Sequence, residues 1–199
     1  MTHRFLICME LLKQRILKDG VVIGTDILKV DSFLNHCIDV SLSLEMGKEF
    51  KLLFSNCTVT KILTVEASGI GLACATAQFF NCPVVFAKKS ATSNCTDDVY
   101  TAPCHSFTHG NDNILRVSNK YLNEGDKVLI VDDFLANGAA VNALMDIVKQ
   151  AGAETVGVGI AIEKGFQGGG DKLRAQGVKV ESLAIIEEMN ESGIRFRNQ

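Results

Sequence analysis

Residues 127–140 read Lys-Val-Leu-Ile-Val-Asp-Asp-Phe-Leu-Ala-Asn-Gly-Ala-Ala, and this stretch decides the fold class. Its apolar run predicts a buried strand that delivers two adjacent carboxylates, Asp132 and Asp133, to its carboxyl end. A loop of small residues follows, and a helix is expected from about Gly138. Ligands of open parallel sheets lie outside the carboxyl ends of the strands, and helix N-termini bind phosphate. The stretch therefore predicts a phosphosugar site, whereas the acidic pair alone would be compatible with an ordinary strand end.

Apolar runs typical of strands alternate with helical patterns over the rest of the chain. We expect strands at 62–65, 83–87, 128–131 and 156–162, helices at 72–80, 139–150 and 169–175, earlier helices at 9–18 and 39–54, and a sheet-edge hairpin at 178–186 and 193–196. Continuous apolar strands alternating with helices indicate a parallel sheet that is covered on both faces. The sequence thus predicts an α/β fold with a mostly parallel central sheet.

Two regions do not fit this alternation. The amphipathic pattern begins at Met9, so we interpret residues 1–8 as an N-terminal extension and residues 9–199 as a single domain. Residues 88–113 form a polar stretch that is hard to assign to one element, although 101–108 could contain a strand. Long irregular segments in compact domains often act as lids, and we expect such a role here.

Composition excludes several classes of protein. The 199 residues are 47% hydrophobic and 22% charged, which indicates a globular chain. A net charge of −3 disfavours nucleic-acid binding. The seven cysteines form no CxxC pair and the four histidines show no metal spacing, so reduced thiols in a cytoplasm are expected. No apolar run is long enough for export or a membrane span, and no membrane partner is expected.

Two glycine-rich stretches resemble nucleotide motifs only in part. Gly69-x-Gly71-x-x-Cys74 has cysteine where a dinucleotide fingerprint has its third glycine, and the next strand ends at Lys88-Lys89 instead of an acidic residue. Residues 165–172, Gly-Phe-Gln-Gly-Gly-Gly-Asp-Lys, imitate a P-loop, but an aspartate precedes the lysine and no Ser or Thr follows it. We reject both a nicotinamide site and a nucleoside triphosphatase.

The stretch at 127–140 resembles the ribosyl-diphosphate fingerprint of the type I phosphoribosyltransferases. Its residue sequence is similar to that of bacterial members that act on xanthine. Segments 28–36, 65–70, 83–87, 147–153 and 162–167 fit the same enzymes in order, so the likeness covers residues 9 to about 183. It implies the type I phosphoribosyltransferase fold, with a small hood formed by about residues 20–40 plus the C-terminal hairpin, and a flexible lid loop. It also implies a homodimer.

The implied activity is purine salvage: transfer of 5-phosphoribosyl from 5-phosphoribosyl 1-diphosphate to xanthine, which yields xanthosine 5′-monophosphate and pyrophosphate. Magnesium would be held mainly by the substrate, with no dedicated protein site. The resemblance places Asp132 and Asp133 at the catalytic centre. It assigns ribosyl-diphosphate binding to Glu66, Ala67, Ser68, Gly69, Lys89, Ala136, Asn137, Gly138, Ala139 and Ala140, and xanthine binding to Leu28, Asn35, Lys164 and Phe166.

One departure from the family pattern concerns the phosphate loop. The common fingerprint has threonines there, whereas this chain has Ala136, Asn137, Ala139 and Ala140. More of the phosphate binding is therefore left to main-chain amides and to Asn137.

Two alternatives stay open. Purine repressors use the same fold to sense ribosyl diphosphate, but such a regulator should carry a basic winged-helix segment, and the first 60 or so residues have no basic excess. A salvage enzyme for adenine or for hypoxanthine and guanine would share the chemistry. Lys164 favours a 6-oxo purine over adenine, because an ammonium group donates hydrogen bonds and accepts none.

Overall fold

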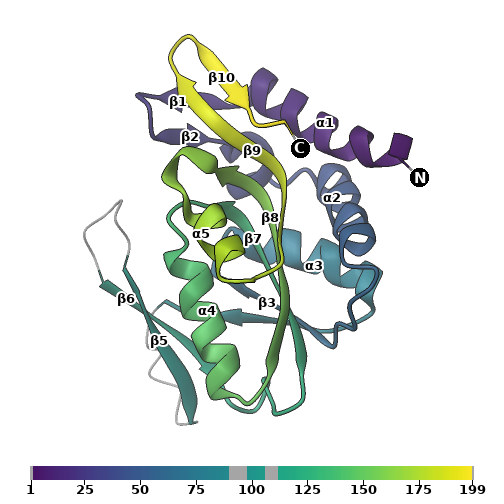
Figure 1. The fold of residues 1–199 in the computed structure, drawn as a ribbon, viewed down its shortest axis with the longest axis vertical. Coiled ribbons are helices and arrows are strands. Elements are labelled where there is room, and N and C mark those ends of the chain that lie inside the picture. Colours follow the sequence, from purple (N-terminus) through teal and green to yellow (C-terminus); the bar gives the residue numbers. More distant parts are fainter. Residues whose placement is uncertain (1, 90–97, 106–111, 199) are drawn as a thin grey trace.

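The computed structural model describes residues 2–89, 98–105 and 112–198, which form a central sheet with helices on both faces (Figure 1). The strands of this sheet are β3 (Lys61–Val65), β4 (Val84–Ala87), β7 (Lys127–Leu135), β8 (Glu154–Lys164), β9 (Val180–Asn190) and β10 (Gly193–Phe196). Their spatial order is β10-β9-β8-β7-β3-β4, and every neighbouring pair is parallel except β9 and β10. The predicted α/β fold with a mostly parallel sheet is confirmed.

Helices cover both faces of the sheet. They are α1 (Thr2–Asp19), α2 (Val40–Leu53), α3 (Gly69–Phe80), α4 (Ala139–Gln150) and the short α5 (Gly169–Ala175). One buried cluster joins the sheet to α1, α2 and α3, and a second cluster joins it to α4 and α5. Figure 1 shows the same division, with α4 and α5 on one side of the strands and α2 and α3 on the other.

The strand order reverses between β3 and β7. From β3 the chain passes through α3 to β4 on one side, whereas β7 leads through α4 to β8 and then to β9 on the other. The loops that follow β3 and β7 therefore separate in opposite directions. Such a switch point opens a crevice at the carboxyl ends of the two strands, which is the usual ligand site of an open α/β sheet.

Aromatic side chains of α2 pack directly onto glycines of β8. A Cβ atom built on Gly159 would lie 3.0 Å from Cδ1 of the Phe50 ring, and one on Gly157 would lie 3.0 Å from Cδ1 of Phe54. Phe50 and Phe54 are fully buried. The missing side chains of β8 thus make room for the rings that fix α2 against the sheet.

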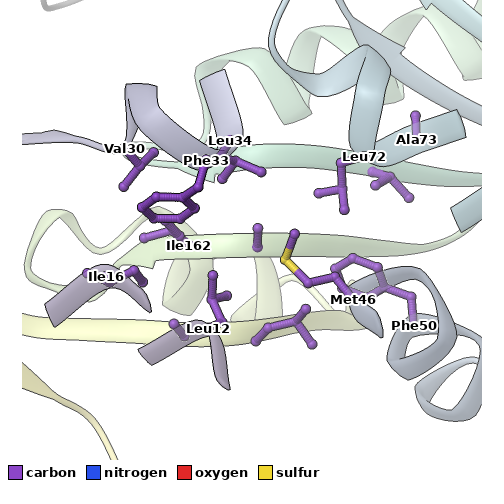
Figure 2. Packing of buried hydrophobic residues seen from close by; sticks show 14 of the residues in the cluster. Leu12, Ile16, Val30, Phe33, Leu34, Met46, Phe50, Leu72, Ala73 and Ile162 are labelled. Carbon is purple, nitrogen blue, oxygen red and sulfur yellow. The ribbon is translucent and has the colours of Figure 1, made fainter. Parts of the chain in front are cut away.

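A small N-terminal unit covers the carboxyl end of β8. It consists of the antiparallel strands β1 (Val21–Ile23) and β2 (Ile27–Lys29), followed by a short π-helical turn, η1 (Asp31–Asn35). Figure 2 shows Phe33 of this turn beside Ile162 of β8. The unit corresponds in sequence to the hood expected at residues 20–40.

Several boundaries differ from the sequence prediction. β7 continues to Leu135, so Asp132 and Asp133 lie inside the strand and not after its end. α1 begins at Thr2, seven residues before the expected start at Met9. Parts of the polar stretch at 88–113 form β5 (Val99–His105) and β6 (Asp112–Ser118), which pair antiparallel. Residues 90–97 and 106–111 lie outside the described part of the chain, and so does that portion of the expected lid.

None of the helices described is both long enough and apolar enough to cross a membrane.

The contact between α2 and β8 predicts the effect of Gly159→Val. The added side chain must displace the Phe50 ring, so we expect the free energy of unfolding to fall by about 1–3 kcal/mol. Urea denaturation measures the change. Val40→Ala is the control, because Val40 is 63% exposed and should stay within about 0.5 kcal/mol of the wild type. Equal stability of the Gly159→Val protein would contradict the packing described.

Candidate functional site

Two adjacent carboxylates are buried in β7 next to the switch point. Asp132 is 4% exposed and Asp133 is 6% exposed. The main-chain N–H of Asp133 donates to Oδ1 of Asp132 (3.1 Å). Burial, and then the neighbouring charge of Asp133, raise the pKa of Asp132 well above its ordinary value. Within the described residues neither carboxylate forms an ion pair with a lysine, arginine or histidine. Two acids in this state favour a ligand that brings hydroxyl groups or positive charge.

The loop after β7 presents main-chain donors. Gly138 has a φ of 92° and caps α4 without a side-chain hydrogen bond, which leaves the start of the helix open. Asn137 Oδ1 accepts a hydrogen bond from the N–H of Ala139 (2.9 Å). The Ala139 amide is therefore already bonded inside the loop, which the sequence did not indicate. The Asn137 side-chain NH2 and the N–H of Ala140 are the donors that this arrangement leaves for an anion.

The turn after β3 approaches the acidic pair closely. A Cβ atom on Gly69 would lie 2.6 Å from Oδ1 of Asp132, so only glycine allows the N-terminus of α3 to come this near. Ser68 precedes the helix and makes no side-chain capping bond, and the Glu66–Ala67 peptide bond is cis. The turns after β3 and β7 thus both lie next to the acidic pair, at the switch point.

Lys89 is fixed to the turn after β3 through its backbone. Its main-chain N–H donates to Glu66 Oε1 (2.7 Å), and its side chain is exposed. The positive charge of Lys89 acts on Asp132 and opposes the rise of that pKa. Lys88 exchanges two main-chain hydrogen bonds of 2.9 Å with Arg116 of β6. The structure therefore brings a cation near the acids.

Lys164 is the last residue of β8 and connects three segments. Its Nζ donates to the main-chain oxygen of Asp26 (2.6 Å), in the turn between β1 and β2. The same Nζ lies 5.7 Å from the centroid of the Phe134 ring. Burial lowers the pKa of Lys164. A ligand with a carbonyl oxygen or a negative charge would stabilise this partly desolvated ammonium group.

The other residues that the sequence assigned to a base differ in accessibility. Phe166 follows Lys164 in a short 3-10 turn, η2 (Gly165–Gln167), and is 38% exposed. Asn35 ends η1, and its Oδ1 is buried without a hydrogen-bond partner in the structure described. Leu28 is 6% exposed and packs in the core of the N-terminal unit. Phe166 is thus open to a ligand and Asn35 holds a buried acceptor without a partner, whereas the side chain of Leu28 mainly supports the unit.

Two residues at the site were not singled out from the sequence. Phe134 directly follows the acidic pair and presents its ring to Lys164, and its position in the quoted stretch was the available signal. Thr64 is fully buried, and its Oγ1 has no hydrogen-bond partner among the described residues. It lies against Gly69, beside Asp132. No pattern in the sequence distinguishes Thr64 from an ordinary strand residue.

The donor set bears on how a metal ion could be held. In the part of the chain that is described, no three His, Cys, Asp or Glu side chains come close enough to form a metal site. Magnesium keeps several waters and binds through one or two carboxylates plus substrate phosphates. Asp132 and Asp133 fit a magnesium ion that arrives with a phosphorylated ligand.

Comparison with known proteins gives a consistent result. A family model described as phosphoribosyl transferase domain matches residues 47–197. The xanthine phosphoribosyltransferase of Clostridium novyi (strain NT) is 59% identical over 190 residues, which cover 96% of this chain and 100% of that protein. The xanthine phosphoribosyltransferase of Clostridioides difficile (strain 630) is 53% identical over 95% of this chain and 100% of its own length.

Solved structures add a likeness of fold. Adenine phosphoribosyltransferase from Rhodothermus marinus superposes with a TM-score of 0.71 at 24% identity, over 90% of this chain and 99% of that one. At this identity the match supports the fold alone. The family match over residues 47–197 and the relatives at 53–59% identity show that the chain belongs to the type I phosphoribosyltransferase family.

Proposed function

We propose that this protein is a xanthine phosphoribosyltransferase. It transfers the 5-phosphoribosyl group of 5-phosphoribosyl 1-diphosphate to xanthine and releases pyrophosphate. The observation that carries the proposal is the buried pair Asp132 and Asp133, set between two turns with free main-chain donors at the switch point of the sheet. Relatives that are 53–59% identical over nearly their full length carry the name of this activity.

In the reaction a purine nitrogen forms a bond to the anomeric carbon, the bond from that carbon to the diphosphate breaks, and the nitrogen loses its proton. Positive charge develops on the sugar ring, so the site works by positioning and electrostatics. Asp132 and Asp133 accept hydrogen bonds from the ribose hydroxyls, and their negative charge favours the cationic ring. Magnesium, when bound, neutralises the diphosphate charge.

The two turns divide the phosphates of the donor. Residues 136–140 surround the 5-phosphate, with the Ala140 amide and the Asn137 side-chain NH2 as donors, while Gly138 leaves the loop open. Residues 66–69 and Lys89 face the diphosphate. Because Lys89 is bonded to Glu66 through its main chain, its side chain remains free to reach that leaving group.

The base lies between β8 and the N-terminal unit in this proposal. Lys164 donates to a purine carbonyl oxygen, Asn35 Oδ1 accepts from a ring N–H, and Leu28 supports the contact from the hood. Phe134 and Phe166 offer ring faces for stacking. The orphaned Oδ1 of Asn35 supports this assignment, since a buried acceptor without a partner is unfavourable unless a ligand supplies one.

The competing functions make different predictions. A ribosyl-diphosphate sensor would bind the donor without consuming it, whereas an adenine enzyme would need an acceptor where Lys164 stands. A spectrophotometric assay with magnesium, donor and each purine in turn distinguishes them. Turnover of xanthine supports the proposal, turnover of adenine alone contradicts it, and binding without turnover favours the sensor.

The homodimer and the cytoplasmic location implied by the resemblance stay predictions, and sedimentation velocity checks the former.

The acidic pair predicts a large loss of activity in Asp132→Asn and in Asp133→Asn. Each change removes a charge that stabilises the cationic ring, so kcat should fall roughly a hundredfold or more. Steady-state kinetics with xanthine measures the loss. Asp146→Asn serves as the control, because Asp146 is exposed on α4. Wild-type kcat in either active-site variant would remove the substituted acid from the mechanism.

The raised pKa of Asp132 predicts that Asp132→Asn stabilises the protein at neutral pH. Because the folded-state pKa lies above the unfolded value, ionisation of Asp132 favours unfolding, and this penalty grows as pH rises from the unfolded pKa toward the folded one. The amide variant lacks the penalty. Denaturation at several pH values should show an advantage near pH 7 that vanishes in acid, and an advantage that grows toward acid would contradict the assignment.

Lys164 predicts a specific loss of xanthine use in Lys164→Met. A charged hydrogen bond to a carbonyl contributes about 1.5–3 kcal/mol, so kcat/KM for xanthine should fall roughly tenfold to a hundredfold. The KM for 5-phosphoribosyl 1-diphosphate should change little. Lys172→Met, an exposed lysine on α5, provides the comparison. An unchanged kcat/KM would show that Lys164 does not touch the base.

A further inference from the structure

A buried ion pair stands directly behind Lys164. Glu163 is completely buried, and its carboxylate accepts two hydrogen bonds from Arg174 of α5, at 3.0 Å (Nη1 to Oε1) and 2.7 Å (Nη2 to Oε2). The Ser182 hydroxyl on β9 donates to the same carboxylate. Successive side chains of a strand point to opposite faces, so Glu163 points away from the side on which Lys164 meets Asp26 and Phe134.

The glycines between these residues press α5 against the phosphate loop. The N–H of Gly169 donates to the main-chain oxygen of Ala136 (3.2 Å), and a Cβ atom there would lie 2.7 Å from the nitrogen of Gly138. A Cβ atom on Gly170 would lie 2.7 Å from Glu163 Oε2. Gly169 and Gly170, in the stretch that imitates a P-loop, therefore form a wedge. Gly169 contacts the phosphate loop on one side, and Gly170 contacts the Glu163 carboxylate on the other.

The C-terminal segment holds the same helix from outside. Arg197 donates to both oxygens of Asp171 (2.8 and 3.1 Å) and to Glu187 Oε2 (2.6 Å). Its main-chain N–H donates to the oxygen of Ile185 (2.8 Å). Figure 1 places α5 beside β9, whose hairpin leads to this segment. α5 is thus tied to β8 by Arg174 and to β9 by Arg197.

We propose that Arg174 and Glu163 are positioning residues that hold Lys164 and Phe166 in register with the phosphate loop, and so set which purine is used. This inference rests on the proposed phosphoribosyl transfer. Lys164 and Phe166 lie at one end of the segment 164–174, which the ion pair closes at the other end, at Arg174. The wedge in the middle of this segment touches the loop that is to hold the 5-phosphate.

The consequence for the reaction is geometric. The purine nitrogen must meet the anomeric carbon at close range, and a displacement of about 1 Å can lower a rate roughly a hundredfold. The phosphate loop sets the position of the anomeric carbon, whereas Lys164 sets the position of the base. Arg174 fixes the distance between the phosphate loop and Lys164 without touching either substrate. It also leaves Glu163 with the partner that a buried charge requires.

Arg174→Met tests the proposal, with purine selectivity as the readout. The ratio of kcat/KM for xanthine to kcat/KM for hypoxanthine cannot change through a loss of folded enzyme, since that loss scales both values equally. We expect this ratio to change roughly tenfold or more, and kcat with xanthine to fall by a similar or larger factor. The matched control is Lys61→Met, which breaks the Lys61–Asp126 pair (3.0 Å) at the amino ends of β3 and β7.

Two milder variants keep the test decisive if Arg174→Met does not fold. Arg174→Lys keeps the positive charge but loses the pair of hydrogen bonds to the Glu163 carboxylate. Glu163→Gln keeps one side-chain oxygen as an acceptor but loses the negative charge. Both variants should give a ratio of kcat/KM for xanthine to kcat/KM for hypoxanthine between those of the wild type and Arg174→Met. Lys61→Met should keep the wild-type ratio despite lower stability. Folded Arg174 and Glu163 variants with an unchanged ratio would overturn the positioning role alone. A wild type that turns over no 6-oxo purine would overturn the proposed function itself.

Discussion

The rest of the site depends on two carboxylates that are buried side by side and form no ion pair with the described side chains. Asp132 and Asp133 share a strand in the middle of the sheet, where burial and mutual repulsion disfavour the second negative charge. A structural role would be better served by apolar residues at these positions. The arrangement becomes favourable when a ligand supplies hydroxyl donors or positive charge, which a ribosyl ring does during transfer. Stability is thus given up where the reaction needs negative charge.

Close backbone approach, which only glycine permits, assembles the surroundings of this pair. Gly69 lets the N-terminus of α3 meet Asp132, and Gly169 lets the start of α5 meet the loop that ends at Gly138. Both glycines stood in stretches that resemble nucleotide motifs and were rejected as such. In the structure both glycines serve close packing: they bring two helix starts and one loop to the same edge of the sheet. A partial motif match can therefore mark a close contact even where the named ligand is absent.

The sequence predicted what depends on local pattern and missed what depends on contacts between distant segments. Alternating apolar runs and helices were enough to predict the parallel sheet, and the order of acids, loop and helix indicated that the two carboxylates lie next to a helix start. The length of β7 was underestimated because Asp132 and Asp133 read as polar, although pairing with β8 carries the strand past them to Leu135. The bond between Asn137 and Ala139 and the orphaned oxygen of Asn35 depend on rotamers that no pattern encodes.

The proposed base subsite shows why its residues were assigned by resemblance and not by chemistry. Lys164 ends β8, Asp26 lies in the turn before β2, and Phe134 lies in β7, so three segments meet at one ammonium group, and the turn with Asp26 lies more than a hundred residues before the other two. Each residue alone is ordinary. Because the amine is partly desolvated and donates to a main-chain oxygen of the N-terminal unit, its position depends on how β8 meets that unit. If phosphoribosyl transfer proceeds as proposed, base selectivity therefore depends on how these segments are held together as much as on the residues proposed to touch the base.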